Sequence, residues 1–250
     1  MPVTLVANAK ILTLDIETSP AKAFVWGTFK QNIATSQIIE PTRMLSYSAK
    51  WLDGKQETHG EWEYEDRFYF IVRLHELLEE ADIVVTYNGK TFDIPHINRE
   101  FILQGLTPPD PYGHVDLYQI VRSKFRFQSG KLAWVVTALE LDRKMETGGF
   151  ELWVKVLDGD AKAQRTMLRY NAKDVKITEQ LYEELRPWIT TGPNVAIIEG
   201  KAHACPRCAS TAVQKRGVHR TSVSTFQQYR CNECGAWSRG GKRLDKTELR

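Results

Sequence analysis

The placement of the four cysteines constrains this chain most. All four lie in the last fifth of the sequence, as two Cys-x-x-Cys pairs separated by 22 residues: Cys205, Cys208, Cys231 and Cys234. Each pair aims two sulfurs at one ion, and this arrangement is typical of a four-thiolate structural Zn²⁺ site. A redox dithiol or unpaired thiols are the alternatives. The segment is too small to fold on a core of its own, so we favour zinc, which would supply the missing folding energy.

Charge divides the chain at the same place. Residues 201–250 carry 11 Lys and Arg against 3 Asp and Glu, whereas residues 1–200 carry 23 basic and 28 acidic residues. A basic tail on a mildly acidic body predicts a polyanionic partner for the tail and carboxylate chemistry in the body. The basic residues alternate with aromatic ones, a pattern suited to phosphate contacts and base stacking, although a solvated protein-docking surface remains the alternative. These residues are Lys215, Arg216, Arg220, Phe226, Tyr229, Arg230, Trp237, Arg239, Lys242 and Arg243.

Patterning predicts a layered α/β domain over residues 1–190. A linker at 191–202, a metal-bound module at 203–240 and a frayed, charged tail at 241–250 are expected to follow. Alternating or apolar runs predict strands, and apolar stripes predict helices. The expected strands are 10–16, 23–29, 44–52, 82–87 and 223–230, and the expected helices are 67–80, 94–103, 117–124, 132–141 and 161–185. No apolar run approaches the ~20 residues that span a bilayer, so we expect a soluble, cytoplasmic protein without a membrane partner.

The first of three polar motifs is Asp15-Ile16-Glu17, at the end of the first expected strand. Residues two apart in a strand point to the same face, so the two carboxylates would stand side by side while Ile16 enters the core. Taken alone, the motif is more typical of a polar strand end that faces water.

Two further motifs carry carboxylates. Asn88-Gly89-Lys90-Thr91-Phe92-Asp93 leaves the expected strand 82–87, at the edge where open α/β sheets build their sites. Asp93 is alternatively the N-cap of the helix that follows. Tyr170 and Asp174 are four residues apart in the expected helix 161–185 and so share a face, where a surface pair is the simpler interpretation.

Taken together, the motifs favour a metal site. Four carboxylates repel one another and lose hydration when they are gathered, and hard divalent cations remove that cost. An oxygen-only set without histidine suits Mg²⁺ or Mn²⁺. Two such ions about 4 Å apart form the clamp that cleaves phosphodiesters.

The ordered set Asp15-x-Glu17, Asn88-x-x-x-Phe92-Asp93 and Tyr170-x-x-x-Asp174 resembles the three motifs of the DEDD superfamily of 3′–5′ exonucleases, which includes polymerase proofreading domains. Tyrosine at the last motif is similar to the DEDDy branch. The resemblance covers residues 10–185 and implies a ribonuclease-H-like mixed sheet flanked by helices. The C-terminal cysteine segment resembles a zinc ribbon.

The resemblance also implies roles by position. Asp15, Glu17 and Asp174 would bind a first Mg²⁺ or Mn²⁺, with Asp15 bridging to a second ion held by Asp93. Tyr170 would orient the attacking water. Substrate contacts would come from Thr18, Ser19, Asn88, Lys90 and Phe92.

We therefore expect a metal-dependent 3′–5′ exonuclease with two Mg²⁺ or Mn²⁺ ions and one structural Zn²⁺. Single-stranded DNA ends are favoured over RNA as the substrate, and a separate polymerase or replication protein is a candidate partner. A bacterial or bacteriophage source would suit such a chain. The alternatives are a non-catalytic nucleic-acid-binding protein on a nuclease-like scaffold, or an endonuclease that uses the same metal site. Asp116 is expected to cap the helix at 117–124.

Overall fold

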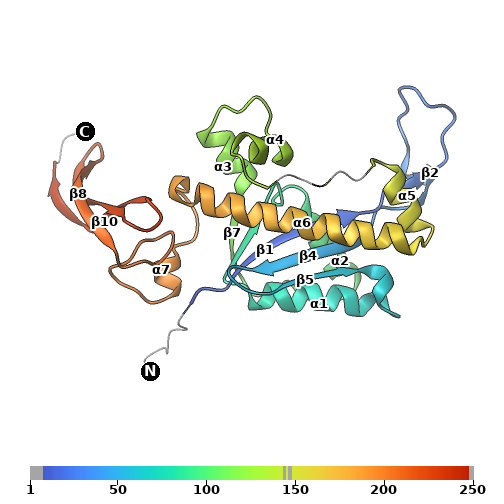
Figure 1. Ribbon diagram of the computed structural model, residues 1–250, viewed down its shortest axis with the longest axis horizontal. Coiled ribbons are helices and arrows are strands. Elements are labelled where there is room, and N and C mark those ends of the chain that lie inside the picture. The colour runs from blue at the N-terminus through green and yellow to red at the C-terminus, as the bar shows by residue number, and fades with distance from the viewer. Residues whose placement is uncertain (1–7, 143–144, 146–147, 248–250) are drawn as a thin grey trace.

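The body of the protein is built on a mixed five-stranded sheet (Figure 1). The computed structural model describes residues 8–142, 145 and 148–247. The strand order is β5-β4-β1-β6-β7, in which β1 runs antiparallel to β4 and parallel to β6. The strands are β1 (Ile11–Thr18), β4 (Met44–Trp51), β5 (Gln56–Gly60), β6 (Ile83–Thr86) and β7 (Gly113–Asp116).

Helices cover both faces of this sheet. Helices α1 (Arg67–Glu80) and α2 (Asp93–Leu103) pack on one face, and α3 (Leu117–Lys124), α4 (Leu132–Ala138) and the long α6 (Ala161–Leu185) pack on the other. The expected helices 67–80, 117–124 and 161–185 are confirmed at both ends, and the expected mixed sheet flanked by helices is confirmed. Asp116 caps α3, because its carboxylate accepts the backbone N–H of Tyr118.

The alternation of β1 decides which of its side chains meets which layer. Leu12, Leu14 and Ile16 are buried in the core beneath α1 and α2. Asp15 and Glu17 point to the opposite face, toward α6. One face of the strand therefore anchors the sheet, and the other face presents two carboxylates to the long helix.

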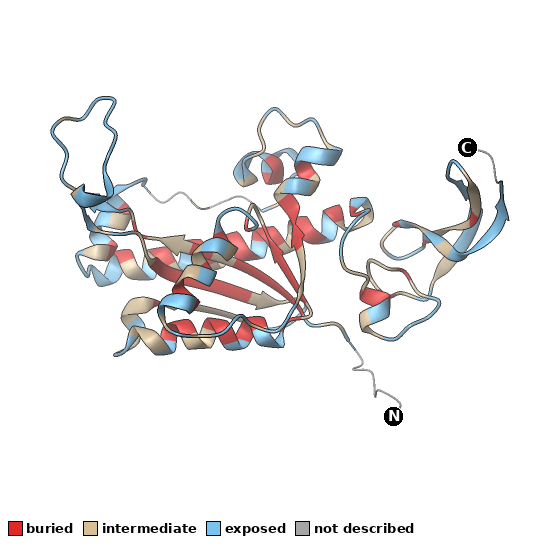
Figure 2. Cartoon of the chain, turned by 180° about the vertical axis from the view of Figure 1, so that it is seen from behind, coloured by how far each residue is buried: buried red, intermediate tan, exposed pale blue. Residues whose placement is uncertain are grey.

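The predicted strand 23–29 is wrong for most of its length. Only Lys22–Ala23 (β2) pairs, with Ile38–Glu40 (β3), and the rest forms a long exposed arm (Figure 2). Trp26 is 94% exposed at this arm. Aromatic residues favour strands because they pack on neighbouring strands, whereas Phe24, Trp26 and Phe29 remain exposed here.

The predicted linker at 191–202 is ordered and packed. It contains α7 (Val195–Ile198), and Val195 is buried in the same core cluster as Leu185 of α6. The N–H of Val195 donates to the carbonyl of Pro206, and the Arg207 guanidinium donates to the carbonyl of Pro193. These contacts attach the C-terminal segment to the end of the body.

The C-terminal module, residues 203–247, is a three-stranded antiparallel sheet of order β10-β9-β8. Its strands are β8 (Val213–Arg220), β9 (Ser224–Cys231) and β10 (Trp237–Lys246). The predicted frayed tail at 241–250 is wrong as far as Lys246, because β10 continues to that residue; residues 248–250 lie outside the described residues.

The remaining elements are short. Helix α5 (Glu151–Leu157) packs against the first part of α6, and three 3₁₀ turns cover Thr35–Gln37, Glu61–Glu63 and Arg186–Trp188. Within the described part of the chain, no helix is both long and apolar enough to cross a bilayer.

Candidate active site

Three of the predicted carboxylates meet in one cluster. Asp15 and Glu17 come from β1 and Asp174 from α6, and one carboxylate oxygen of each lies within 4.8 Å of the other two. Asp174 is 2% exposed, whereas the two β1 residues are partly exposed. The cluster therefore has a buried side on α6 and an open side on the sheet.

A buried amide fixes the position of Asp15. Asn171 donates from Nδ2 to Oδ2 of Asp15 at 2.6 Å and accepts from the Ser46 hydroxyl at 3.2 Å. Asn171 is fully buried, and its helix face also carries Asp174. Because both ends of the amide are engaged, the Asp15 carboxylate is held in one orientation.

Sequence reasoning missed Asn171. The signal was a polar residue inside the apolar stripe of α6, where Met167, Asn171, Asp174 and Thr178 are all buried. A buried polar side chain in such a stripe needs a hydrogen-bond partner, and the apolar face of the helix packs on the sheet. The partner is therefore expected on the sheet.

Asp93 lies in the first turn of α2, beside the backbone of β1. Its Oδ1 accepts the N–H of Ile16, the residue between the two β1 carboxylates, at 3.1 Å. The alternative interpretation of Asp93 as a helix N-cap is wrong, because Phe92 occupies that position. Asp93 is 3% exposed, and burial raises the pKa of its carboxyl from 3.8 to about 7, although the Ile16 N–H opposes this rise.

Asp93 is not part of the three-residue cluster. Its hydrogen bond to Ile16 nevertheless places it against the strand segment that carries Asp15 and Glu17. The described contacts of the buried Asp93 carboxyl include no cation, in contrast to those of Glu100. Glu100 is equally buried, but hydrogen bonds from Arg67 and from the Met44 N–H outweigh its desolvation and lower its pKa. Glu100 is thus a structural carboxylate, whereas Asp93 is suited to gain a positive partner.

The turn before Asp93 is organised by Asp116. Its carboxylate accepts the backbone N–H groups of Asn88 and Lys90 at 2.9 and 3.1 Å, besides capping α3. Asn88 has a φ of +67°, and a Cβ on Gly89 would lie 2.4 Å from the Thr86 side chain. Gly89 is therefore required by close approach, and Asp116 holds the turn that leads to Asp93.

Tyr170 lies one turn before Asp174 on the same side of α6. It is 9% exposed and packs edge-on against Trp153 of α5, with ring centroids 6.4 Å apart. The Trp153 indole N–H donates to the carbonyl of Thr18 at 3.1 Å. Trp153, which sequence reasoning also missed, thus links the end of β1 to Tyr170.

The other predicted substrate residues differ in setting. Ser19 is buried and exchanges hydrogen bonds with the backbone of Arg43, which fixes the chain just after Glu17. Lys90 is exposed, and Phe92 is 41% exposed with its ring edge-on to His96. Phe92 is therefore available at the surface rather than packed in the core.

The four cysteines form a second candidate metal site. Their sulfurs all lie within 4.8 Å of one another, and the Cys205–Cys234 and Cys208–Cys231 pairs are 3.6 and 3.7 Å apart. These separations are too long for disulfides, and all four thiols are free. A tetrahedral Zn²⁺ at ~2.3 Å from each sulfur requires sulfur separations of about 3.8 Å. The donor set therefore fits Zn²⁺.

The comparisons with known proteins agree with this architecture. The family model described as RNase_H superfamily matches residues 12–186, so the chain belongs to the ribonuclease H superfamily. The predicted ribonuclease-H-like fold is confirmed. Asp15, Glu17, Asp93, Tyr170 and Asp174 all lie within the matched region.

A solved structure shares the fold. It is a family B DNA polymerase from the hyperthermophilic archaeon Pyrobaculum calidifontis, with a TM-score of 0.52 and 17% sequence identity. The similarity covers 86% of this chain and 31% of the polymerase, so the chain spans less than a third of that protein. No curated protein matches the sequence.

Proposed function

We propose that this protein is a metal-dependent 3′–5′ exonuclease that hydrolyses the terminal phosphodiester of a nucleic acid. The observation that carries the proposal is the meeting of Asp15, Glu17 and Asp174 within 4.8 Å in a chain of the ribonuclease H superfamily. Holding three carboxylates this close is unfavourable without a cation, since each one repels the others. Oxygens around a divalent ion such as Mg²⁺, at ~2.1 Å each, lie about 3–4 Å apart, so the cluster fits such an ion after a small contraction.

We assign the four carboxylates to metal binding. Asp15, Glu17 and Asp174 would hold one Mg²⁺ or Mn²⁺, and Asp93, beside Ile16, would help hold a second. Asn171 keeps Asp15 in the orientation that binding needs. Bound ions of this kind activate water and stabilise the leaving oxygen of a phosphodiester.

Tyr170 is the proposed positioning group for the attacking water. Tyr170 would act by donating or accepting a hydrogen bond rather than as the base. The backbone around Thr18 and Ser19, fixed by Trp153 and Arg43, would bind the terminal nucleotide. Asn88, Lys90 and Phe92 would contact the substrate from the turn before α2.

We propose that the C-terminal module is a zinc ribbon that assists substrate binding. The tetrahedral spacing of its sulfurs and its excess of basic residues support both parts of this proposal. Single-stranded DNA ends are the proposed substrate, and a separate polymerase or replication protein is a proposed partner. An endonuclease on the same site is the alternative activity.

The test uses one oligonucleotide labelled in turn at its 5′ and 3′ ends, incubated with purified protein and Mg²⁺. A 3′–5′ exonuclease gives a ladder of single-nucleotide steps from the 5′-labelled strand and releases a labelled mononucleotide at once from the 3′-labelled strand. Asp174→Asn, which keeps the side-chain shape, serves as the inactive control. Internal products of discrete length would favour the endonuclease, and no cleavage with Mg²⁺ or Mn²⁺ would refute the proposal.

A further inference from the structure

A groove in the C-terminal module has a composition that the catalytic site does not explain. Its volume is about 490 Å³, and it lies between the segment before the first cysteine pair and one face of the three-stranded sheet. Its lining includes the cations Lys215, Arg239 and Lys242 together with Tyr229 and His203. Among the described residues that line it, none is Asp or Glu. A groove of this size is large enough for about one nucleotide unit.

Cross-strand pairing brings the groove residues into one row. Lys215 of β8 and Ser238 of β10 both pair with Tyr229 of β9, which lies between them. The Lys215 ammonium and the Tyr229 ring therefore stand on the same sheet face. This arrangement offers a cation for a phosphate beside a ring on which a base can stack.

The backbone of β10 is irregular at the groove. Pairing with β9 passes from Arg239–Gln228 to Arg243–Phe226, so two extra residues are present on β10 at Gly240-Gly241-Lys242. A Cβ on Gly240 would lie 3.4 Å from the Tyr229 ring, an ordinary van der Waals distance, so the extra residues run beside that ring. Bulges of this kind redirect side chains, and here Lys242 turns into the groove.

Arg239 also borders the groove, but its guanidinium is held on a ring outside the lining. Its guanidinium lies 4.1 Å from the centroid of the Phe226 ring, a stacking contact that restrains the side chain. Phe226 does not line the groove, and because it is three residues from Tyr229 on β9 it faces the other side of the sheet. Lys215 and Lys242 therefore supply the positive charge in a groove whose described lining carries no carboxylate. The charge and the neighbouring ring both fit the backbone and base of a single nucleic-acid strand.

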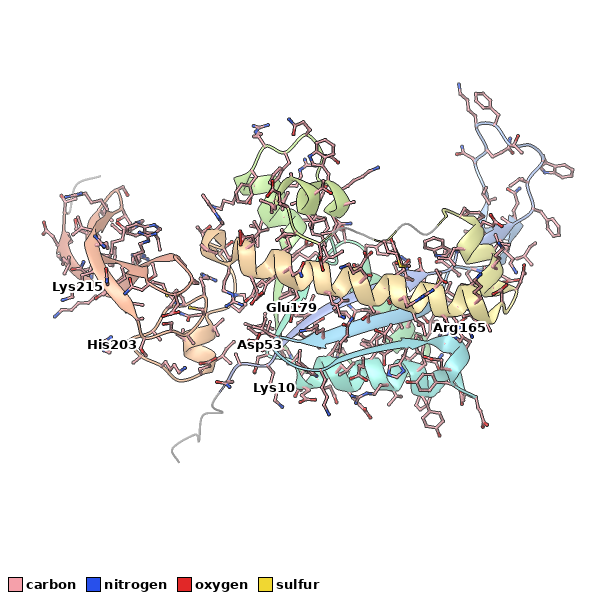
Figure 3. The ribbon with its side chains drawn as sticks, viewed as in Figure 1. Lys10, Asp53, Arg165, Glu179, His203 and Lys215 are labelled. Atoms are coloured by element: carbon pink, nitrogen blue, oxygen red, sulfur yellow. The ribbon has the colours of Figure 1, made fainter. Side chains whose placement is uncertain are left out.

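We propose that this groove binds the substrate strand several nucleotides away from the bond being cleaved, an inference that rests on the proposed nuclease function. Leu185 ends α6 about 16 Å beyond Asp174 along the helix axis, and the groove lies past that end. Figure 3 shows Lys215 and His203 in the C-terminal module, beyond the end of the helix that carries Arg165 and Glu179. At ~3.4 Å per stacked nucleotide, a strand needs more than about five nucleotides to reach both sites.

The test exploits two neighbouring pairs of equal charge. Lys215 and Lys242 line the groove, whereas Arg216 and Arg243, each the next residue along its strand, are exposed and do not. The double variants Lys215→Gln/Lys242→Gln and Arg216→Gln/Arg243→Gln lose the same net charge. Binding of a fluorescent 20-nucleotide single-stranded DNA is measured by anisotropy across a salt series, in Ca²⁺ to suppress cleavage, and a thermal melt confirms folding.

We expect the two pairs to behave differently. Two lost phosphate contacts lower the single-strand salt slope by about 1.4, which corresponds to roughly 25-fold weaker binding at 0.1 M salt than in the wild type. The Arg216/Arg243 variant should lose several-fold less affinity than the groove variant, because these two side chains lie outside the groove. Equal losses in both variants, or wild-type affinity in the groove variant, would overturn the proposal. The result does not depend on cleavage, so failure of the exonuclease assay and failure of the groove are separate outcomes.

Discussion

Asp93 allows a quantitative test of the metal site through the stability of the metal-free protein. Burial raises the pKa of its carboxyl from 3.8 to about 7. The folded state therefore binds a proton that the unfolded state has released, so metal-free stability falls as pH rises from about 4 through 7. Asp93→Asn keeps the oxygen that accepts the Ile16 N–H but removes the titration.

The size of the effect follows from these two pKa values. The full difference of about three pKa units corresponds to about 4 kcal/mol, of which about 3 kcal/mol develops between pH 5 and 8.5. With divalent ions removed by dialysis against EDTA and the zinc restored, Asp93→Asn should gain stability over the wild type by that amount across this range. Adding Mn²⁺ should shrink the difference, because the ion stabilises the ionised carboxylate of the wild type.

The assay is urea unfolding followed by tryptophan fluorescence at a series of pH values. The exposed Asp110→Asn is the control for the loss of one carboxylate at the surface. The claim that Asp93 is a desolvated carboxylate that binds a cation would be refuted by either of two results. The difference in unfolding free energy between Asp93→Asn and the wild type could be independent of pH, or the wild type could be the more stable protein at pH 8.5.

Three further outcomes are expected. Tyr170→Phe should still bind Mn²⁺ in calorimetry, while its single-turnover cleavage rate falls roughly 10²–10⁴-fold because only the positioning hydroxyl is lost. Loss of Mn²⁺ binding would show that Tyr170 supports the structure of the site instead. Asn171→Leu should raise the Mn²⁺ concentration needed for half-maximal cleavage and lower the free energy of unfolding by about 1–3 kcal/mol, since Asp15 loses its buried donor. An unchanged Mn²⁺ dependence would show that Asn171 does not orient Asp15 for metal binding. Cys205→Ser/Cys234→Ser should lose the bound zinc in elemental analysis and bind DNA more weakly, but should still cleave normally at saturating substrate. Retained zinc would contradict the four-thiolate site.

Periodicity in the sequence was enough to predict the parts that local physics controls. The alternation around Ile16 placed Asp15 and Glu17 on one face of β1, and the structure has Ile16 in the core with the two carboxylates opposite. The expected helix 161–185 matches α6 at both ends. The structure adds its cap, because the Asp160 carboxylate accepts the N–H groups of Lys162 and Ala163. Asp174 therefore fell on the helix face that meets β1.

Other features depended on distant partners that periodicity does not contain. The sequence was equally compatible with Asp93 as a helix cap. The structure has Phe92 at that cap, and Asp93 accepts the N–H of Ile16, 77 residues away. Asn171 stood inside a recognised motif, but its bonds to Ser46 and Asp15 arise from packing. The arm around Trp26 looked like a strand because its composition suits one, but among the described residues only Lys22–Ala23 of that segment pairs with a strand.

The central claim is that β1 and α6 together build a divalent-cation site that cleaves nucleic acid. The most direct measurement is calorimetric Mn²⁺ binding to the zinc-loaded protein, read beside cleavage of an end-labelled oligonucleotide, for the wild type and Asp174→Asn. We predict that the wild type binds Mn²⁺ and shortens the strand from its 3′ end, and that Asp174→Asn loses both properties while remaining folded. Full Mn²⁺ affinity and normal cleavage in Asp174→Asn would contradict the claim.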